Sequence, residues 1–436
     1  MDSEIKQRIE MVRRGEVPEG YKKIQRDIIP KDWTIKSLAE VGNNFSYGMN
    51  AAAKAYDGHN KYIRITDIDD NTHIYTGLDL VSPNADLELK YRVQENDILF
   101  ARTGATVGKT YLYNKNDGIL FFAGFLIRVN IPIDNSYYVY EQTLTGRYLN
   151  WIRIMSQRSG QPGINAQEYG TYSFPYCCVK EQQKIAAILT TQDKAIELKE
   201  KRLAEKQRQK KYLMQQLLTG KKRLPGFSGQ WKIKGFNQVF TFGATNTFSR
   251  ECMCEGSTGI KNIHYGDILV RYGEVLKLSE QEIPSLRSDI GAKITTYVDD
   301  GDVVIADTAE DLTAGKVVEV QETHGKKVAA GLHTMLCKPI KSCFAPGWLG
   351  YYMNSETYHK QLVPYIAGVK VMSISKGNIV KTHILVPPIE EQTAIVSVLS
   401  TADREIDLLR QDIEQEKQKK KALMQLLLTG IVRVKL

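Results

Sequence analysis

The sequence lacks long hydrophobic runs, which excludes a protein built on membrane-spanning helices. No uninterrupted run of about eighteen apolar residues occurs, although a spanning helix needs roughly 20 such residues. The chain also does not open with the basic stretch, short apolar segment and small-residue cleavage site of a secretory signal. We therefore expect a cytoplasmic protein.

Cysteine is scarce and is not spaced for metal binding. The chain has six cysteines and seven histidines. None of the cysteines forms a C-x-x-C pair, and the adjacent Cys177 and Cys178 do not combine with the scattered histidines into a ligand framework. We expect reduced and mostly buried cysteines, as in a cytosolic protein, and no metal site.

Motifs for catalysis are also missing. The run TGATVGKT has only three residues between Gly104 and Gly108, where a phosphate-binding loop needs four, and Thr103 stands where such a loop has glycine. The run VPPI at 386–389 lacks the residues of an amino-methyltransferase site, and neither G-x-S-x-G nor H-E-x-x-H occurs. We expect a non-catalytic chain that binds no cofactor of its own.

The chain does have length and positive charge. Its 436 residues are enough for two or three domains with a sizeable core. The net charge is +9 and the isoelectric point is about 9.0. Such a balance favours an anionic partner, more often nucleic acid than a membrane surface, although simple solubility explains it nearly as well.

One long stretch occurs twice. Residues 181–220 align with residues 391–430 without a gap, so that each residue of the first copy corresponds to the one 210 positions later. Glu181 and Glu391 are identical partners, and so are Gln182 and Gln392. The run LLTG ends both copies. An ungapped match of this length indicates an internal duplication.

Each copy has the pattern of a long helix. Neither contains proline or glycine before its last residue, and Gly220 and Gly430 suit the position that closes a helix. Apolar residues recur every seven positions, interrupted in the main column by Lys210 and Lys420. The first copy has a weak second column and therefore needs a partner helix. The predicted coiled-coil seam consists of Ile185, Leu189, Ile196, Leu203, Leu213, Leu217, Ile395, Leu399, Ile406, Leu409, Ile413, Leu423 and Leu427.

The helical copies alternate with two globular blocks of mixed α/β character. Short strand-like runs punctuated by glycine and Asn/Asp residues fill both blocks, and the runs correspond in order although their sequences diverge. We therefore predict a mixed α/β fold with a pseudo-twofold internal repeat, in which a long antiparallel two-helix coiled coil separates the two blocks. The predicted segments are an N-terminal helix and linker at 1–30, the first block at 31–180, the first long helix at 181–222, the second block with its lead-in at 223–390, and the second long helix at 391–436.

Basic and aromatic residues in the loops of the blocks are candidates for DNA contact. Arginine can pair bidentately with guanine, whereas lysine and threonine mostly hold phosphate. Each candidate taken singly is better explained as a solvated surface residue than as a base reader. The candidates are Tyr47, Lys54, Tyr56, Lys61, Arg64, Arg102, Thr103 and Lys109 in the first block, and Arg250, Lys261, Arg271, Tyr272, Lys316, Lys326 and Lys327 in the second.

The combination resembles a known family. Two divergent blocks alternate with repeated helices that begin EQQKIAAIL and EQTAIVSVL and end LMQQLLTGKKRLPGF and LMQLLLTG. The lead-in GYKKIQRDIIPKDW precedes the first block, and NDILFARTGATVGKT lies inside it. Over essentially its whole length, the chain resembles the DNA-specificity subunit of type I restriction–modification enzymes.

The resemblance implies a function and a set of partners. Each block would be a target recognition domain for one half of a two-part sequence in double-stranded DNA. The coiled coil would set the gap and dock two modification subunits, which methylate adenine at N6. Restriction subunits would add a translocase and nuclease. S-adenosylmethionine, ATP and Mg²⁺ would belong to these partners, and this chain would bind none of them.

Two alternatives stay open. The chain could be the recognition subunit of a fused restriction–methylation enzyme of type IIB-like organisation, which cuts outside its site. It could also be a coiled-coil scaffold that reads no sequence, and such a scaffold would show little preference among duplexes. The divergent, strand-rich blocks argue against the scaffold.

Overall fold

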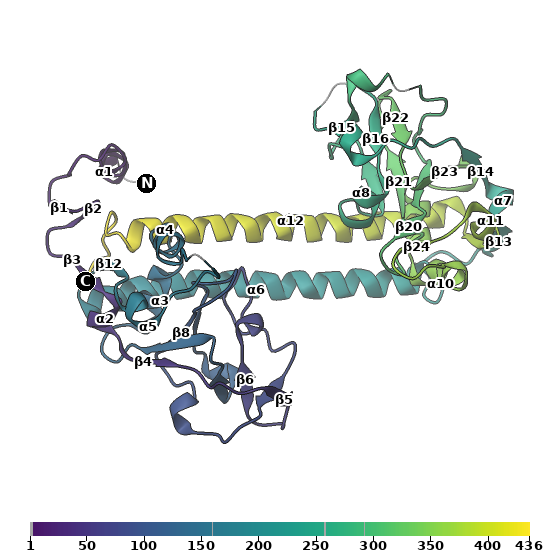
Figure 1. The fold of residues 1–436 in the computed structure, drawn as a ribbon. Coiled ribbons are helices and arrows are strands. Elements are labelled where there is room, and N and C mark those ends of the chain that lie inside the picture. Colours follow the sequence, from purple (N-terminus) through teal and green to yellow (C-terminus); the bar gives the residue numbers. More distant parts are fainter. Residues whose placement is uncertain (1–2, 159, 257–258, 292) are drawn as a thin grey trace. The chain divides into compact units, whose positions relative to one another are not determined.

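The computed structural model describes residues 3–158, 160–256, 259–291 and 293–436 (Figure 1). The chain forms two compact units. Unit 1 contains Met1–Lys199 and Asp412–Leu436, and unit 2 contains Glu200–Gln411. Two long helices, α6 (Val179–Leu217) and α12 (Ile389–Leu427), each contribute one part to unit 1 and the other part to unit 2.

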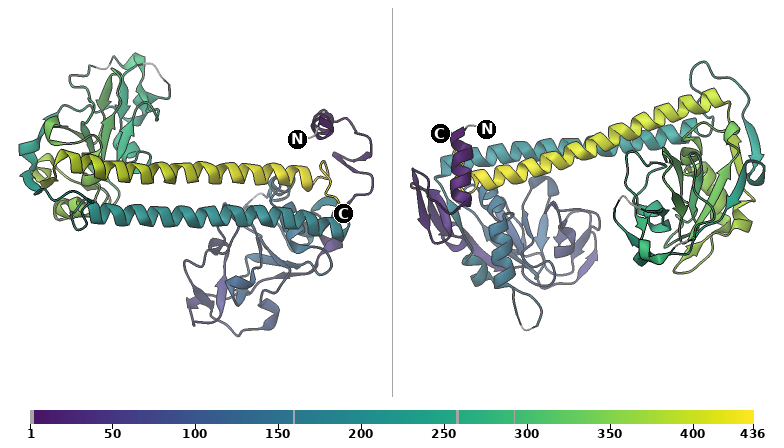
Figure 2. Two further views of the ribbon diagram at one scale, coloured as in Figure 1. Left: turned by 180° about the vertical axis from the view of Figure 1, so that it is seen from behind. Right: turned by 90° about the horizontal axis from the view of Figure 1, so that it is seen from above.

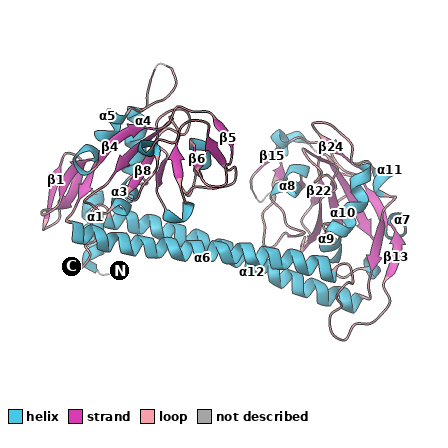
Figure 3. Cartoon of the chain, turned by 90° about the horizontal axis from the view of Figure 1, so that it is seen from below, coloured by secondary structure: helices cyan, strands magenta, loops and turns pink. Residues whose placement is uncertain are grey.

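Unit 1 combines short strands with short helices (Figure 3). Its strands are β1 (Tyr21–Ile24), β2 (Asp27–Pro30), β3 (Thr34–Ser37), β4 (Asn43–Tyr47), β5 (Ala53–Ala55), β6 (Lys61–Ile63), β7 (Val81–Pro83), β8 (Asp97–Ala101), β9 (Thr110–Leu112), β10 (Leu120–Phe122), β11 (Leu126–Asn130) and β12 (Ser173–Tyr176). Its shorter helices are α1 (Ser3–Arg13), α2 (Leu38–Val41), α3 (Ser136–Gln142), α4 (Gly146–Met155) and α5 (Ala166–Gly170).

Unit 2 has the same mixed composition. Its strands are β13 (Lys232–Gly235), β14 (Phe240–Gly243), β15 (Met253–Cys254), β16 (Lys261–Ile263), β17 (Val275–Lys277), β18 (Ser285–Leu286), β19 (Val303–Ala306), β20 (Thr308–Ala309), β21 (Val317–Gln321), β22 (Val328–Ala330), β23 (Thr334–Pro339), β24 (Met372–Ser373) and β25 (His383–Val386). Its shorter helices are α7 (Phe236–Val239), α8 (Tyr265–Val270), α9 (Trp348–Met353), α10 (Glu356–Leu362) and α11 (Lys376–Ile379).

The two units share one strand topology. The main sheet of unit 1 has the antiparallel order β4-β11-β8-β9, and that of unit 2 has the order β14-β23-β19-β21 with β17 added parallel at the edge. Both units also contain one parallel pair, β6 with β10 and β16 with β22. The central strands β8 and β19 are buried along their whole length, because each lies between two neighbouring strands. The shared order confirms the predicted internal repeat of two mixed α/β blocks.

The long helices lie side by side and antiparallel within each unit (Figure 2). In unit 1, Lys199 pairs with Asp412 and Asp193 pairs with Lys420, so the number rises along α6 as it falls along α12. In unit 2, Lys206 contacts Glu405 in the same sense. Both helices end at the predicted glycines. Gly220 and Gly430 have φ of +69° and +72°, a conformation that glycine adopts without strain.

The seam residues divide into two groups. All thirteen are buried or half-buried. Those near the helix ends, such as Ile185 and Leu427 in unit 1, belong to the hydrophobic core of the adjoining block. Those further along, such as Ile196 and Ile413, lie outside these block cores. The predicted seam residues are thus shielded from solvent, and those near the helix ends also pack into the cores of the blocks.

Some local details differ from the sequence-based expectations. The segment predicted as a helix and linker at 1–30 also contains a hairpin of β1 and β2. In the first block, α4 begins as a helix separate from α3, since the Thr145 side chain accepts from the Tyr148 backbone N–H and caps it. The cysteines are free but not mostly buried, because only Cys177 and Cys337 are enclosed.

Candidate nucleic-acid interface and the long helix pair

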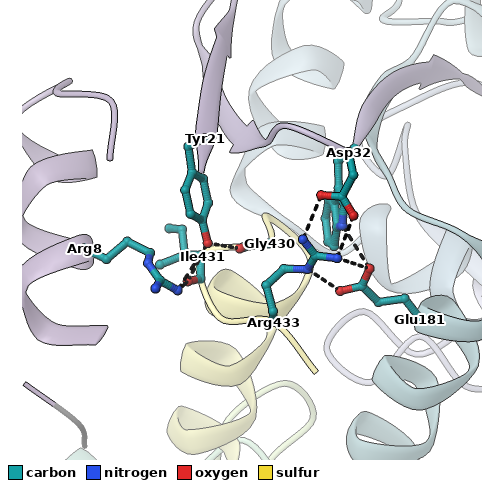
Figure 4. Close-up of polar contacts among 8 residues, drawn as sticks. Arg8, Tyr21, Asp32, Glu181, Gly430, Ile431 and Arg433 are labelled. Atoms are coloured by element: carbon teal, nitrogen blue, oxygen red, sulfur yellow. Dashed lines mark hydrogen bonds and ion pairs between the residues drawn. The ribbon is translucent and has the colours of Figure 1, made fainter. Parts of the chain in front are cut away.

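A buried glutamate joins the first turn of α6 to the rest of unit 1 (Figure 4). The Trp33 indole N–H donates to Glu181 at 3.0 Å, and the Arg433 guanidinium donates to both Glu181 oxygens at 2.6 and 2.9 Å. Arg433 also forms a two-point pair with Asp32, at 2.8 Å for each contact. Burial opposes the charge on Arg433, but the bonds to Glu181 and Asp32 outweigh it and raise the Arg433 pKa.

The N-terminal segment contacts the same region. The Tyr21 hydroxyl donates to the Gly430 carbonyl at 2.7 Å, and Arg8 donates to the Ile431 carbonyl at 3.0 Å (Figure 4). These bonds fasten the hairpin and α1 to the segment after α12. The end of one long helix and the start of the other are thereby tied to the same block.

Unit 2 repeats this junction with one partner fewer. Trp231 donates to Glu391 at 2.9 Å, and Arg223 forms a two-point pair with the same carboxylate. The residue before Trp231 is Gln230, where unit 1 has Asp32 before its tryptophan. Arg223 donates instead to the Gly229 carbonyl at 2.9 Å. Glu181 and Glu391, which are identical partners in the repeat, thus each accept from a tryptophan and an arginine of their own unit.

The unequal partners predict unequal mutational costs. Glu391→Gln removes the carboxylate that pairs with Arg223, whereas Glu181→Gln leaves Arg433 its pair with Asp32. We expect the free energy of unfolding to fall by about 2–3 kcal/mol for Glu391→Gln and by about 1–2 kcal/mol for Glu181→Gln. Equilibrium unfolding in urea measures both variants, each serving as the other's matched control. Equal losses, or a larger loss at Glu181, would contradict the assignment.

The glutamines next to these glutamates fix the start of each long helix. The Gln182 side chain donates to the Cys177 carbonyl at 3.0 Å and accepts from the Asn135 backbone N–H at 3.0 Å. The Gln392 side chain likewise donates to the Cys343 carbonyl and accepts from the Ala345 N–H, both at 2.9 Å. Both glutamines are buried, so these amide bonds explain why the repeat retains them.

The lysines that interrupt the heptad column are half-buried, and each pairs with two carboxylates. In unit 1, Lys420 lies 2.9 Å from Glu141 and 2.8 Å from Asp193. Burial raises the pKa of Glu141, while the charge of Lys420 counteracts part of that rise. Lys420 itself keeps a raised pKa, because the two carboxylates outweigh the effect of its burial. Lys420 on α12 therefore connects Glu141 on α3 of the block with Asp193 on α6.

The corresponding lysine of unit 2 has the same surroundings. Lys210 lies 2.8 Å from Glu274 and 2.6 Å from Asp403. The Tyr351 hydroxyl donates to Asp403 at 2.6 Å, as Tyr137 does to the matching aspartate of unit 1. Polar residues in the weak second column of α6 also find acidic partners on α12 within their units, and these residues are Gln192, Lys199 and Lys206.

Three of the residues predicted to contact DNA have buried side chains. The Lys109 ammonium is enclosed and donates to the Ile68 carbonyl at 2.8 Å. Lys261 is buried and donates to the carbonyls of Gly256 and Ile283, and Tyr272 is buried in a core cluster. Their side chains stabilise loops from inside the blocks and do not lie on a surface that DNA can reach.

Other candidates are engaged with the protein itself. Arg64 pairs with Asp67 and Asp79, and Arg250 pairs with Asp267. Four further candidates direct their cationic groups at backbone carbonyls, and these are Lys61, Arg271, Lys316 and Lys326. Burial lowers the pKa of Lys316. The cationic groups of these residues thus already bind acceptors of the protein, which their charge in the sequence did not reveal.

The remaining candidates are more accessible. Tyr47 is 42% exposed, and the Arg102 guanidinium stacks on its ring at 4.8 Å from the ring centre. Lys54 and Lys327 are exposed, and the others in this group, Tyr56 and Thr103, are half-buried. Sequence reasoning missed Phe125, which is 60% exposed beside Arg102 in the turn between β10 and β11. In the sequence, a large aromatic residue in a glycine-containing turn is the feature that could have marked Phe125 as a candidate.

No group of His, Cys, Asp and Glu residues suited to holding a metal ion occurs in the described parts of the chain. Among the helices that the structure describes, none is both long and apolar enough to cross a membrane.

The sequence matches a family of known proteins. The sequence model of the type I restriction modification DNA specificity domain matches twice, at residues 30–208 and 229–418. A putative type I restriction enzyme MjaX specificity subunit of Methanocaldococcus jannaschii is 24% identical over 96% of this chain and 97% of its own length. The MjaVIII specificity subunit of the same organism is 24% identical over 79% of this chain and 80% of its own length.

Solved structures share the fold. A chain from a structural study of complex assembly and conformational transition in the type I R-M system has a TM-score of 0.56, with 16% identity over 93% of this chain and 99% of that one. The type I restriction–modification S subunit from M. genitalium has a TM-score of 0.53, with 12% identity over 93% of this chain and 98% of that one. The two family matches cover most of the sequence and fall on the two repeated halves. The chain therefore belongs to the family of type I restriction–modification DNA specificity subunits.

Proposed function

We propose that this specificity subunit reads a two-part sequence in double-stranded DNA, one part with each block. The observation that carries the proposal is the pairing of a shared frame with divergent loops. Both units use the same strand order and the same glutamate, glutamine and lysine anchors on α6 and α12. The loops on those frames differ in length and charge, as two readers of different sequences require.

The long helices supply the spacing in this proposal. Forming an antiparallel coiled coil, they hold the two blocks at a fixed separation, so that the two half-sites are divided by a constant number of unread base pairs. Readers on one face of B-DNA need half-sites about 34–36 Å apart, or a multiple of it. The net charge of +9 supports affinity for the phosphate backbone.

The partners follow from the duplicated surfaces. Like surfaces on the repeated helices can dock two copies of one subunit, and we propose adenine-N6 methyltransferase subunits in this place. Restriction subunits would join the same assembly. S-adenosylmethionine, ATP and Mg²⁺ would be bound by those partners, while this chain contributes sequence reading and geometry.

A change in the gap tests the proposal. Inserting about five base pairs between the half-sites turns one half-site by half a helical turn, away from its reader. We expect methylation by the complete complex to fall at least about 100-fold on such DNA. Substituting the same number of gap base pairs without changing the length is the control, which should leave methylation intact. Full methylation of the lengthened site would overturn the fixed spacing, and equal methylation of unrelated duplexes would favour a scaffold.

A further inference from the structure

A backbone frame in unit 1 holds one arginine at a defined place. Arg102 directly follows the central strand β8. Its backbone N–H donates to the Phe125 carbonyl at 3.0 Å, and its carbonyl accepts from the Ile164 N–H at 2.9 Å. Two bonds between Ala101 and the segment at 108–109 close the hairpin that carries it. The position is fixed by main-chain bonds, whatever side chain it bears.

Unit 2 builds the same frame around an aspartate. Asp307 directly follows the central strand β19. Its N–H donates to the His333 carbonyl at 3.1 Å, and its carbonyl accepts from the Ile374 N–H at 2.8 Å. Ala306 exchanges two bonds with the segment at 315–316, as Ala101 does with 108–109. Arg102 and Asp307 therefore occupy equivalent places, while their side chains are opposite in charge and in hydrogen-bonding character.

Among the described residues, the Arg102 guanidinium contacts an aromatic ring and has no carboxylate partner. Its guanidinium stacks on the exposed Tyr47 ring, which restricts its orientation. Its Nε is buried and has no hydrogen-bond partner among the described residues. The other predicted arginines, by contrast, face carboxylates: Arg64, Arg250 and, at 3.8 Å, Arg271. A structural arginine would have such a partner, so the stacked guanidinium is available to an external acceptor.

The Asp307 side chain offers the reverse chemistry. The Thr308 hydroxyl donates to one of its oxygens, Oδ1, at 2.7 Å. His333 Nδ1 lies 3.5 Å from the same oxygen, and the His333 ring is half exposed at its edge contact with Tyr265. The other oxygen, Oδ2, forms none of these contacts. An ionised carboxylate has several acceptor sites and no donor.

These opposite groups match opposite base edges. In the major groove guanine presents two acceptors, N7 and O6, which suit an arginine, and cytosine presents the N4 amine, which suits an aspartate. We propose that this shared place is a base-reading position in both units. Arg102 reads a guanine in one half-site, and Asp307 accepts a hydrogen bond from a cytosine amine in the other. The inference rests on the proposed function and adds the residues and the bases.

The exposed Phe125 fits this assignment. Its carbonyl fixes Arg102, and its ring faces solvent next to the reader. An aromatic ring there can pack against a base or sugar and exclude water from the arginine–guanine contact. The backbone bond between Arg102 and Phe125 thus places an apolar residue beside the arginine donor.

Methylation of a DNA library by the complete complex tests the proposal. The library varies each base of both half-sites singly, around the sequence that the wild-type complex methylates. With Arg102→Ala, we expect preference for guanine at one position to fall roughly 10- to 100-fold. With Asp307→Asn, we expect cytosine preference at one position of the other half-site to fall, with adenine gaining, because asparagine pairs with adenine. Every other position should keep its preference.

Matched controls and the unaltered half-site separate the outcomes. Lys115→Ala and Asp289→Asn make the same charge changes at exposed ion pairs elsewhere, and they should alter no base preference. Preserved reading of the other half-site shows within the same molecule that each variant is folded. Equal weakening on every sequence would mean a phosphate contact and overturn the inference. Unchanged preferences would also overturn it, whereas a wild-type complex with no two-part preference would remove the proposed function itself.

Discussion

Replacing Lys420 with methionine is expected to lower the free energy of unfolding by about 3–5 kcal/mol, because it leaves two carboxylates facing each other without their cation. Glu141 is fully enclosed and Asp193 is partly so, and both lie within 3 Å of the Lys420 ammonium. The Glu141 oxygen that Lys420 does not contact has no hydrogen-bond partner among the described residues. The glutamate therefore depends on this lysine for its charge.

The loss should depend on pH in a defined direction. Burial already raises the pKa of Glu141 in the folded protein, and removing Lys420 raises it further. A group whose folded-state pKa lies above its unfolded value contributes stability below the unfolded pKa, and that contribution is lost as the pH rises through the folded pKa. The deficit of Lys420→Met should therefore be largest at about pH 8 and shrink towards about pH 5, as Glu141 takes up a proton.

Lys419→Met is the matched control for this experiment. Lys419 precedes Lys420 on the same helix but is exposed, and it pairs with Glu416 at 3.3 Å. We expect its loss to cost less than about 1 kcal/mol at any of these pH values. Urea unfolding of the three proteins across the pH range provides the comparison. A deficit for Lys420→Met that matches the control, or that grows as the pH falls, would contradict the buried-pair assignment.

The sequence made the long helices and the repeat predictable because their signals are local or periodic. An ungapped match, a seven-residue period and a terminal glycine predict both helices, and α6 and α12 begin two residues before the predicted 181 and 391. The segment predicted for the second helix extended to residue 436, whereas α12 ends at Leu427, because Gly430 follows with a positive φ. The corresponding order of strand-like runs along the chain was also predictable from the sequence. Periodicity cannot reveal why Lys210 and Lys420 interrupt the seam.

Side-chain environments were less predictable, because they depend on contacts between distant residues. Lys109 lies in a loop and Lys261 is the first residue of β16, yet distant backbone carbonyl groups accept hydrogen bonds from both ammonium groups. Arg102 and Arg64 look alike in sequence, and only the structure distinguishes the stacked guanidinium from the one paired with Asp67. Loop charge in the sequence therefore does not reveal which cationic side chains are already paired within the protein.

The junctions link the anchoring of the helices to the reading of DNA in our proposal. In unit 1 the start of α6 and the end of α12 are tied to one block by Glu181 and Lys420, and unit 2 ties the other two ends through Glu391 and Lys210. Each of these helix segments is thus joined to its own block by a polar contact as well as by apolar packing.

The helix pair between those anchors carries the second large prediction. Ile196 is buried between the pairs Asp193–Lys420 and Lys199–Asp412 in unit 1, and Ile406 is buried at the equivalent place in unit 2. A carboxylate at either place would be buried, and the neighbouring lysines are already paired with other carboxylates. We expect Ile196→Asp with Ile406→Asp to cost several kcal/mol, to separate the helices locally and to abolish methylation that depends on a fixed gap.

Leu198→Asp with Leu408→Asp is the matched double variant. These leucines are also repeat partners on the same helices, but they are 67% and 64% exposed. A carboxylate there stays in water, so the free energy of unfolding should change by less than about 0.5 kcal/mol per site. Amide hydrogen exchange along α6 and α12 would locate the loosened segment in the first double variant and show none in the second. If the buried variant kept both the wild-type exchange pattern and methylation on the wild-type gap, the helix seam would not be what sets the distance between the two half-sites.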